Sequence, residues 1–221
     1  MAKRIKLKDR ALPRYSRGEE IMNMVTHIVG GAMGIIVLTL CLLRAKGAAA
    51  TVGVTVYGVS MITLYTMSSV YHGLKPGMAK KVMQVIDHCT IYFLIAGTYT
   101  PILLTAFLPV YPAICWGLMA MEWGLAALAT TLTAIDLKKY NAFSMVCYIF
   151  LGWGIVFFLK QTLAVIGTAG FGLLLAGGIA YTIGAVLYGI GSKKAWMHSV
   201  FHIFVVLGSF LQFLAIFLHI L

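Results

Sequence analysis

Residues 22–43 read MNMVTHIVGGAMGIIVLTLCLL, an apolar run that ends at Arg44. A helix needs about 20 apolar residues to cross the hydrocarbon core of a bilayer. The run is also longer than the apolar part of a secretory signal peptide, which is removed from the mature protein. We therefore expect a membrane span that is retained, preceded by a short basic cytoplasmic tail over residues 1–21.

The rest of the chain has the composition of an integral membrane protein. Of its 221 residues, 61% are hydrophobic and 10% are charged, against about 45–50% and 25% in soluble domains. The formal net charge of +11 would suggest a nucleic-acid partner in a soluble protein. Here the basic residues lie between apolar runs, so we expect anionic lipid headgroups as partners and no nucleic acid. The sequence predicts a multi-pass protein of the cell (inner) membrane.

Further apolar runs follow the first. Pro109 and Pro112 divide the longest of them, because proline cannot continue a helix and disfavours helix just before it. Pro101 is expected to kink the third helix. The pattern predicts one all-α domain over residues 22–221, which is a bundle of seven transmembrane helices. Their approximate bounds are 22–43, 51–72, 83–107, 111–134, 140–159, 165–190 and 196–220.

Basic residues are divided unevenly between the two ends of this bundle. Most of the 17 Lys and Arg lie in the N-terminal tail and in the loops after the second, fourth and sixth predicted spans. The opposite end has Arg44, Lys46 and Lys160. Because short loops rich in Lys and Arg stay in the cytoplasm, we predict a cytoplasmic N-terminus and a C-terminus outside.

Four ionisable residues are predicted to lie at one depth. His72 ends the second span, Asp87 begins the third, and His198 and His202 begin the seventh. In an alternating bundle these positions share one end. At about 1.5 Å per residue from the nearest lysine, they lie within roughly 4–12 Å of the cytoplasmic edge. Ionisable groups inside a membrane are costly, so their convergence indicates a functional site.

These residues have the chemistry of a catalytic zinc site. Three neutral imidazoles with an open fourth position are typical ligands of catalytic Zn²⁺, which lowers the pKa of a bound water to about 7. His198 and His202 are four residues apart and share one helix face. We therefore predict zinc at His72, His198 and His202. Asp87 is expected to take the proton of the water, and Ser68, one turn before His72, to hydrogen-bond the water or a ligand.

Polar residues also begin the first span, at the same end of the bundle. Glu20, Asn23 and His27 share one helix face. Three roles remain open for them: a structural polar cluster, contact with the metal ligands or the substrate, or, for His27, metal binding. His88 points about 100° away from Asp87 on a helix, so we expect it to bond a neighbouring helix or a headgroup.

Four motifs along the chain carry a family resemblance. They are GEEIMNMVTHIVGG at 18–31, SSVYHGL at 68–74, IDHCTIYFLIAGTYTP at 86–101 and HSVFH at 198–202. Together they resemble the hemolysin III branch of the progestin and adipoQ receptor family. The resemblance implies a seven-helix bundle with its N-terminus inside and zinc held by three histidines. Carried over by position, the ligands are again His72, His198 and His202, with Ser68 and Asp87 around the zinc-bound water.

The resemblance also bears on function, because the family is linked to metal-dependent membrane hydrolases, including ceramidase-like enzymes that act on lipid amides. Our leading hypothesis is a zinc-dependent hydrolase of a lipid amide or ester, with a membrane lipid as substrate. One alternative is a non-catalytic membrane sensor or regulator with a lipid ligand and structural zinc. The other is a transporter or a pore, which the word hemolysin implies and no residue of the chain explains.

Overall fold

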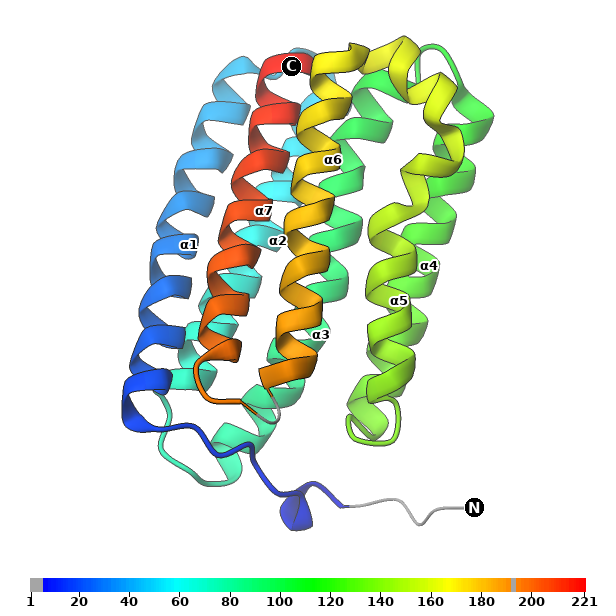
Figure 1. Cartoon of the computed structure of the whole chain (residues 1–221). Coiled ribbons are helices and arrows are strands. Elements are labelled where there is room, and N and C mark those ends of the chain that lie inside the picture. Colours follow the sequence, from blue (N-terminus) through cyan, green and yellow to red (C-terminus); the bar gives the residue numbers. More distant parts are fainter. Residues whose placement is uncertain (1–5, 192–193) are drawn as a thin grey trace.

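The computed structural model describes residues 6–191 and 194–221. Every regular element in this part of the chain is helical, which confirms the all-α class. The elements are η1 (Leu7–Asp9), α1 (Arg17–Arg44), α2 (Gly47–Gly73), α3 (Met78–Pro101), η2 (Ile102–Phe107), α4 (Pro112–Ile135), α5 (Asn141–Trp153), η3 (Gly154–Phe158), α6 (Leu159–Gly191) and α7 (Met197–His219). Figure 1 shows them as a bundle of nearly parallel rods, with the N-terminal segment crossing one end and the C-terminus at the other.

Six helical stretches of the described chain are long and apolar enough to cross a membrane. Five of them match predicted spans with their ends shifted by a few residues. The sixth, Asn141–Gly191, has 51 residues and contains the fifth and sixth predicted spans. In Figure 1 this stretch runs along the bundle as α5, reverses near the end that carries the C-terminus, and returns as α6 beside α7.

Helix α1 begins inside the predicted tail, at Arg17, because the sequence before it forms a capping box. The Ser16 amide donates to Glu19 Oε2 at 2.8 Å, and the Glu19 amide donates to Ser16 Oγ at 3.3 Å. These bonds satisfy two amides that a helix start leaves free. Glu19 Oε1 also accepts the amide of Trp196 at 2.7 Å, which ties the start of α1 to the start of α7.

The prolines act where the sequence predicts. Pro101 ends α3, and the chain continues as the wider π-helix η2, which accommodates the backbone hydrogen bond that proline removes. Pro112 begins α4, where a missing amide costs nothing. Gly53 of α2 lies against this kink: a Cβ at Gly53 would come within 2.8 Å of the Pro101 Cα, so only glycine allows α2 and α3 to approach so closely.

The residues predicted to connect the fifth and sixth spans, 160–164, are themselves helical. After α5 the chain continues as the 3-10 helix η3, and α6 begins at Leu159. No proline occurs in residues 154–166, so nothing removes a backbone hydrogen bond there. The helix is interrupted instead at Gly167, whose φ of 70° and ψ of 174° are accessible to glycine without steric cost.

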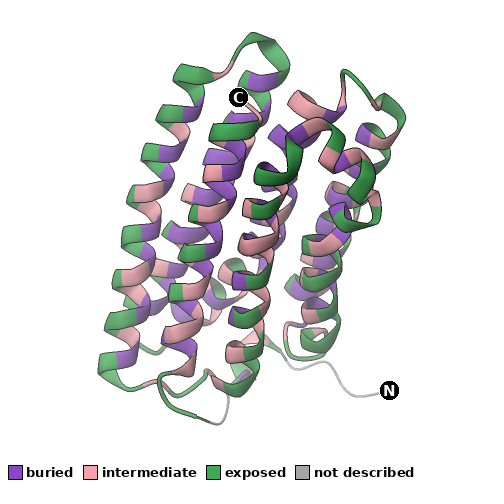
Figure 2. Cartoon of the chain, turned by 45° about the horizontal axis from the view of Figure 1, so that its top comes forward, coloured by how far each residue is buried: buried purple, intermediate pink, exposed green. Residues whose placement is uncertain are grey.

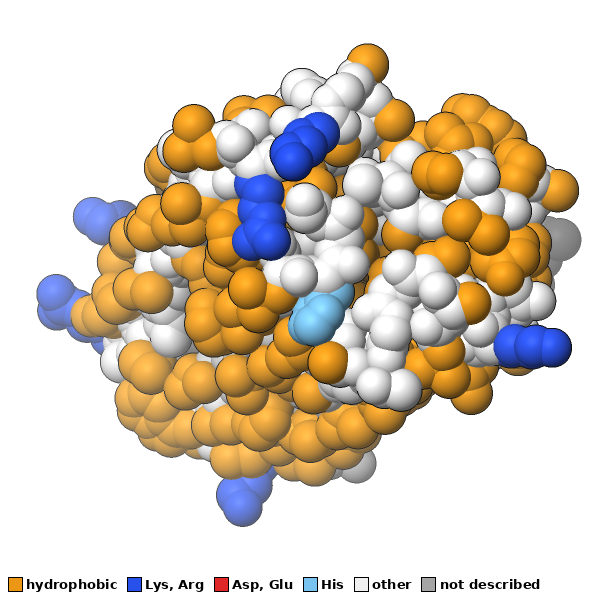
Figure 3. Space-filling model, turned by 90° about the horizontal axis from the view of Figure 1, so that it is seen from above, with side chains coloured by type: hydrophobic (Ala, Val, Ile, Leu, Met, Phe, Trp, Pro, Cys, Tyr) orange, Lys and Arg blue, Asp and Glu red, His pale blue; other side chains and the backbone are white. Residues whose placement is uncertain are grey.

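The buried side chains lie in the interior of the bundle, around its long axis. Figure 2 shows buried residues on the inward faces of the helices and exposed residues on the outward faces. Many outward residues are large and apolar, such as Leu43, Val146 and Phe157, which are 82%, 68% and 75% exposed. Hydrophobic side chains also dominate the rim in Figure 3. This perimeter suits a lipid environment, whereas most of the polar residues of the site face the interior.

Candidate metal centre

The three histidines predicted as ligands lie together. His72 lies in the last turn of α2, and His198 and His202 lie in the first two turns of α7. All three are buried, and one ring nitrogen from each lies within 4.8 Å of the others. Two non-adjacent stretches of the chain therefore bring three imidazoles together. The distances from the cytoplasmic edge estimated from the sequence predict this convergence.

The arrangement fits a divalent metal. The Nε2 atoms of His198 and His202 are 3.1 Å apart, close to the roughly 3.3–3.4 Å expected between two nitrogens of a tetrahedral zinc site with bonds of about 2.0–2.1 Å. His72 Nε2 is buried and has no hydrogen-bond partner among residues 6–191 and 194–221, so its lone pair is free within this part of the chain. Neutral imidazoles suit zinc as well as copper, iron and nickel, so the donor set could hold a metal ion but does not identify the metal.

Glu20 and Lys80 hold the first of these ligands. Glu20 Oε2 lies 2.7 Å from His72 Nδ1, and Glu20 Oε1 accepts a hydrogen bond from Lys80 Nζ at 2.7 Å. When His72 Nδ1 donates its hydrogen to the carboxylate, the lone pair is left on Nε2, which is the atom that faces the cluster. Lys80 also donates to the carbonyls of His72 and Leu74, so its buried ammonium is fully paired.

Asn23 and His27 continue the polar face of α1 into the site. Asn23 Nδ2 lies 3.4 Å from His72 Nδ1. The ring of His27 stacks on that of His202, with centroids 3.8 Å apart and an interplanar angle of 21°. His27 is outside the three-histidine group, so the structure places this residue beside His202 rather than within the group that could hold a metal.

A cavity of about 170 Å³ opens from the metal centre into the bundle. Ser68 and Asp87 line it together with His27, His198 and His202. Ser68 is fully buried, and Asp87 is half-buried with its Oδ2 3.8 Å from His88 Nδ1. The two residues predicted to act on the water thus share a space with two of the predicted ligands. Their catalytic roles stay a prediction.

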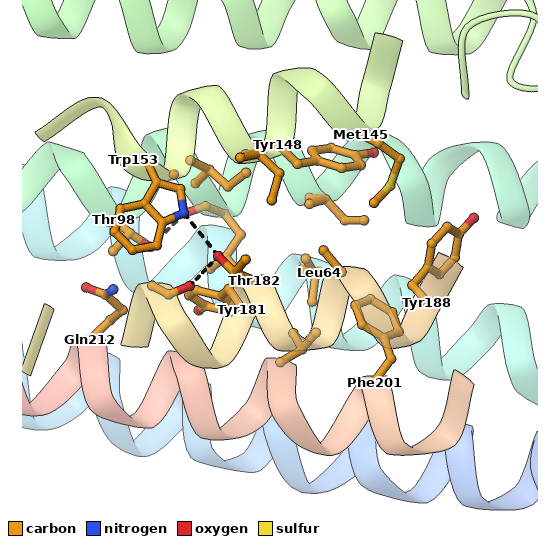
Figure 4. A pocket seen from close by; sticks show the side chains of 18 of the residues that line it. Leu64, Thr98, Met145, Tyr148, Trp153, Tyr181, Thr182, Tyr188, Phe201 and Gln212 are labelled. Carbon is orange, nitrogen blue, oxygen red and sulfur yellow. Dashed lines mark hydrogen bonds between the residues drawn. The ribbon is translucent and has the colours of Figure 1, made fainter. Parts of the chain in front are cut away.

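The cavity is mostly apolar and extends along α3, α5, α6 and α7. Figure 4 shows labelled side chains from Phe201 and Tyr188 at one end to Trp153 and Gln212 at the other. Near the far end, Trp153 Nε1 donates to Thr182 Oγ1 at 3.0 Å and joins α5 to α6. Such a space can hold a hydrocarbon chain whose polar end lies at the histidines.

His88 bonds to a neighbouring helix, as its position in the sequence suggests. Its Nδ1 lies 2.8 Å from the Gln84 carbonyl, and its Nε2 lies 3.2 Å from the Tyr188 hydroxyl. Since Nδ1 must donate to the carbonyl, Nε2 accepts from the hydroxyl. Tyr188 also lies beside His198, with ring centroids 5.6 Å apart. The position of Tyr188 beside these histidines could not be predicted from the sequence, because it depends on how α6 packs against α3 and α7.

The sequence also gives no sign of a cover over the histidines. Tyr15, just before α1, stacks on His198 with centroids 4.9 Å apart and lies 5.8 Å from His72. Burial raises the pKa of its phenol, so it is uncharged. Arg10 Nη2 lies 3.9 Å from Asp136 Oδ1 at the end of α4, and both residues are buried. We call residues 6–16 the N-terminal strap.

Sequence comparison agrees with this geometry. The model of the family described as "Haemolysin-III related" matches residues 15–213, a range that contains all three histidines. The chain belongs to this family. It is an integral membrane protein, and the predicted family is confirmed.

Several relatives within the family cover most of the chain. Hemolysin-3 of Bacillus cereus is 36% identical over 206 residues, 92% of each chain. The Hemolysin-3 homolog of Bacillus subtilis (strain 168) is 34% identical over 201 residues, 90% of this chain and 92% of its own. Monocyte to macrophage differentiation factor of Homo sapiens is 25% identical over 169 residues, 73% of this chain and 67% of its own.

Proposed function

We propose that this protein is a zinc-dependent membrane hydrolase that cleaves a lipid amide or ester. The observation that carries the proposal is the opening of the histidine cluster into an apolar cavity that Ser68 and Asp87 also line. A metal-dependent hydrolase of lipids needs a metal ligand set, a proton acceptor and a dry space for the chain, and residues suited to these three tasks lie together here.

The proposal includes seven spans with the N-terminus in the cytoplasm. The reversal between α5 and α6 supports counting Asn141–Gly191 as two spans. The uneven distribution of Lys and Arg supports the orientation. With this topology the metal centre lies in the cytoplasmic leaflet, at the level of lipid carbonyl groups and headgroups.

The chain's own residues have distinct tasks in this reaction. His72, His198 and His202 would hold zinc, which would supply Lewis acidity toward a water and the lipid carbonyl. Asp87 accepts the proton of the water, and Ser68 orients the water by a hydrogen bond. The apolar cavity excludes bulk water and holds the acyl chain, which strengthens the electrostatic contacts at the reacting atoms.

The residues that line the cavity are consistent with entry of a lipid from the bilayer. Ile149 of α5 and Val156 of η3 line the cavity, and each is 38% exposed at the surface of the bundle. Their exposure supports an opening of the cavity toward lipid near α5. We propose that the acyl chain enters there, while the N-terminal strap covers the histidines at the cytoplasmic end.

The decisive variant is Asp87→Asn, tested in purified protein in lipid nanodiscs with a broad panel of lipid amides and esters. We expect turnover to fall by at least about 10²-fold, as for loss of a general base, with zinc content by elemental analysis unchanged. Asp9→Asn, at an exposed acid of the strap, is the matched control and should keep full activity. A wild-type protein that hydrolyses no lipid of the panel contradicts the proposal.

The same variant separates the hydrolase from a sensor with structural zinc. The three histidines join α2 to α7, so a metal there would also stabilise the bundle. A sensor should keep its cellular function in Asp87→Asn and lose it in His198→Ala. The relatives named Hemolysin-3 raise a pore as the remaining candidate. Liposomes that show histidine-dependent ion flux would favour it.

A further inference from the structure

His27 is a buried histidine without hydrogen bonds. Its side chain is only 3% exposed, and within the described chain neither Nδ1 nor Nε2 has a hydrogen-bond partner. A neutral imidazole carries one N–H donor and one lone-pair acceptor. Leaving both unpaired in the interior costs folding free energy. The protein would therefore be more stable with an apolar residue at position 27, unless a ligand binds the imidazole.

The ring of His27 is held in place by its neighbours. One face stacks on His202 with centroids 3.8 Å apart. The ring of Tyr65 packs edge-on, 5.0 Å away at 78°, and its hydroxyl is anchored on Ser209 Oγ at 2.7 Å. A ring fixed between two partners presents its nitrogens in a constant direction, which is what a binding group requires.

The stacking also argues that these nitrogens do not bind the metal. The rings of His27 and His202 are only 21° from parallel, and imidazole lone pairs lie in the ring plane. Two nearly parallel, stacked rings whose centroids are 3.8 Å apart cannot both direct a lone pair at one ion about 2 Å from each. The free nitrogens are therefore available to something else.

His27 lines the cavity beside Ser68 and Asp87, at the end where the histidines gather. We propose that His27 binds the carbonyl oxygen of the lipid that occupies the cavity, by donating its ring N–H to that oxygen. The remaining ring nitrogen then accepts a hydrogen bond from an N–H or O–H of the headgroup. The inference rests on the proposed function for the substrate class, a lipid amide or ester, and assigns the residue that positions its carbonyl.

A fixed N–H donor at the carbonyl has a chemical consequence. Charge builds up on the carbonyl oxygen as water attacks, so a donor already aimed at that oxygen stabilises the transition state more than the ground state. The removal of one such donor from an acyl-transfer site lowers turnover by about 10²–10³-fold. Substrate binding depends on the same contact, though less strongly.

The test is a binding measurement on His27→Phe, because phenylalanine keeps an aromatic ring against His202 and Tyr65 and removes both nitrogens. Zinc-depleted protein in nanodiscs is titrated with a long-chain N-methyl amide and with the alkane of equal length. We expect amide affinity to fall about tenfold, as for the loss of one hydrogen bond, and alkane affinity to stay unchanged. His219→Phe, at an exposed histidine of α7, is the matched control and should bind both ligands normally.

Unchanged amide affinity in His27→Phe would overturn the inference, and so would a loss of zinc stoichiometry, because the residue would then belong to the metal site. If the variant does not fold, photolabelling of the wild-type protein decides. A long-chain amide with a diazirine beside its carbonyl should label α1 around residues 23–31, and labelling confined to α5 and α6 would refute the contact. Because binding is measured without turnover, a wild-type protein with no hydrolase activity would defeat the proposed function and leave this result standing.

Discussion

At the scale of single residues, we expect the contact between Glu20 and His72 to govern how tightly the candidate site binds a metal. The carboxylate lies 2.7 Å from His72 Nδ1 and fixes the tautomer that leaves the other nitrogen free. We expect Glu20→Gln to lower zinc affinity by about 10–100-fold, as for other residues that orient a metal-binding histidine. Competition with a fluorescent zinc chelator measures the effect.

Glu19→Gln is the matched control for this variant. Glu19 is adjacent in sequence, but its carboxylate bonds the backbone of Ser16 and Trp196 rather than a ligand. The Glu19→Gln protein should keep wild-type zinc affinity, and only the start of α1 should be less stable. Equal zinc affinity in Glu20→Gln and wild type would show that the carboxylate does not support His72.

The clustering of the three histidines could be predicted from sequence, and the contacts that Lys80 and Tyr15 make around it could not. His72, His198 and His202 stand out because imidazoles are rare in apolar runs and the alternation of spans fixes their depth. Lys80 and Tyr15 lie in stretches where charged and aromatic residues are common, so neither is conspicuous. Their contacts with Glu20 and His198 depend on the packing of distant segments, which no local pattern contains.

At the scale of helices, the chain breaks where backbone chemistry dictates and stays helical elsewhere. The break between α3 and α4 is predictable, because Pro109 and Pro112 act locally. The separation of the fifth and sixth spans is predicted from the sequence, but the form of the turn is not, because residues 154–166 are compatible with helix throughout and only tertiary packing selects η3. Gly167 permits the interruption of α6. Its position cannot be recognised from the sequence, because the chain contains 23 glycines.

The bond from Trp153 to Thr182 leads to a prediction about the wall of the cavity. It joins the last residue of α5 to the middle of α6 at 3.0 Å, where η3 has already disturbed the helix. Trp153→Phe keeps an aromatic ring but removes the donor. We expect a fluorescent long-chain lipid to enter the cavity several-fold faster in nanodiscs, because loss of a bond of about 1 kcal/mol favours separation of α5 and α6. Stopped-flow fluorescence measures the rate.

Trp116→Phe provides the comparison for that experiment, because Trp116 is exposed on α4 and does not line the cavity. It should leave the rate of entry unchanged. A rate in Trp153→Phe that equals the wild-type rate would mean that separation of α5 and α6 does not limit entry.

At the scale of the whole molecule, the metal centre is enclosed on the side away from the bilayer interior. The N-terminal strap crosses that end of the bundle (Figure 1) and places Tyr15 against His198 and His72. Its backbone is attached at Lys8, whose carbonyl accepts from Lys81 of α3. Water-soluble molecules that reach the histidines from this end must therefore displace the strap.

This cover predicts slow loss of zinc to a water-soluble chelator and faster loss when Tyr15 is removed. Tyr15→Ala deletes the ring that stacks on His198 but touches no ligand nitrogen, so the amount of zinc bound at equilibrium should remain at the wild-type level while the rate of removal rises about tenfold or more. Tyr140→Ala, at the start of α5 and outside the ring contacts of the histidines, should release zinc at the wild-type rate. Equal rates in all three proteins would mean that the ring of Tyr15 does not limit the escape of zinc, which would contradict its role as a cover.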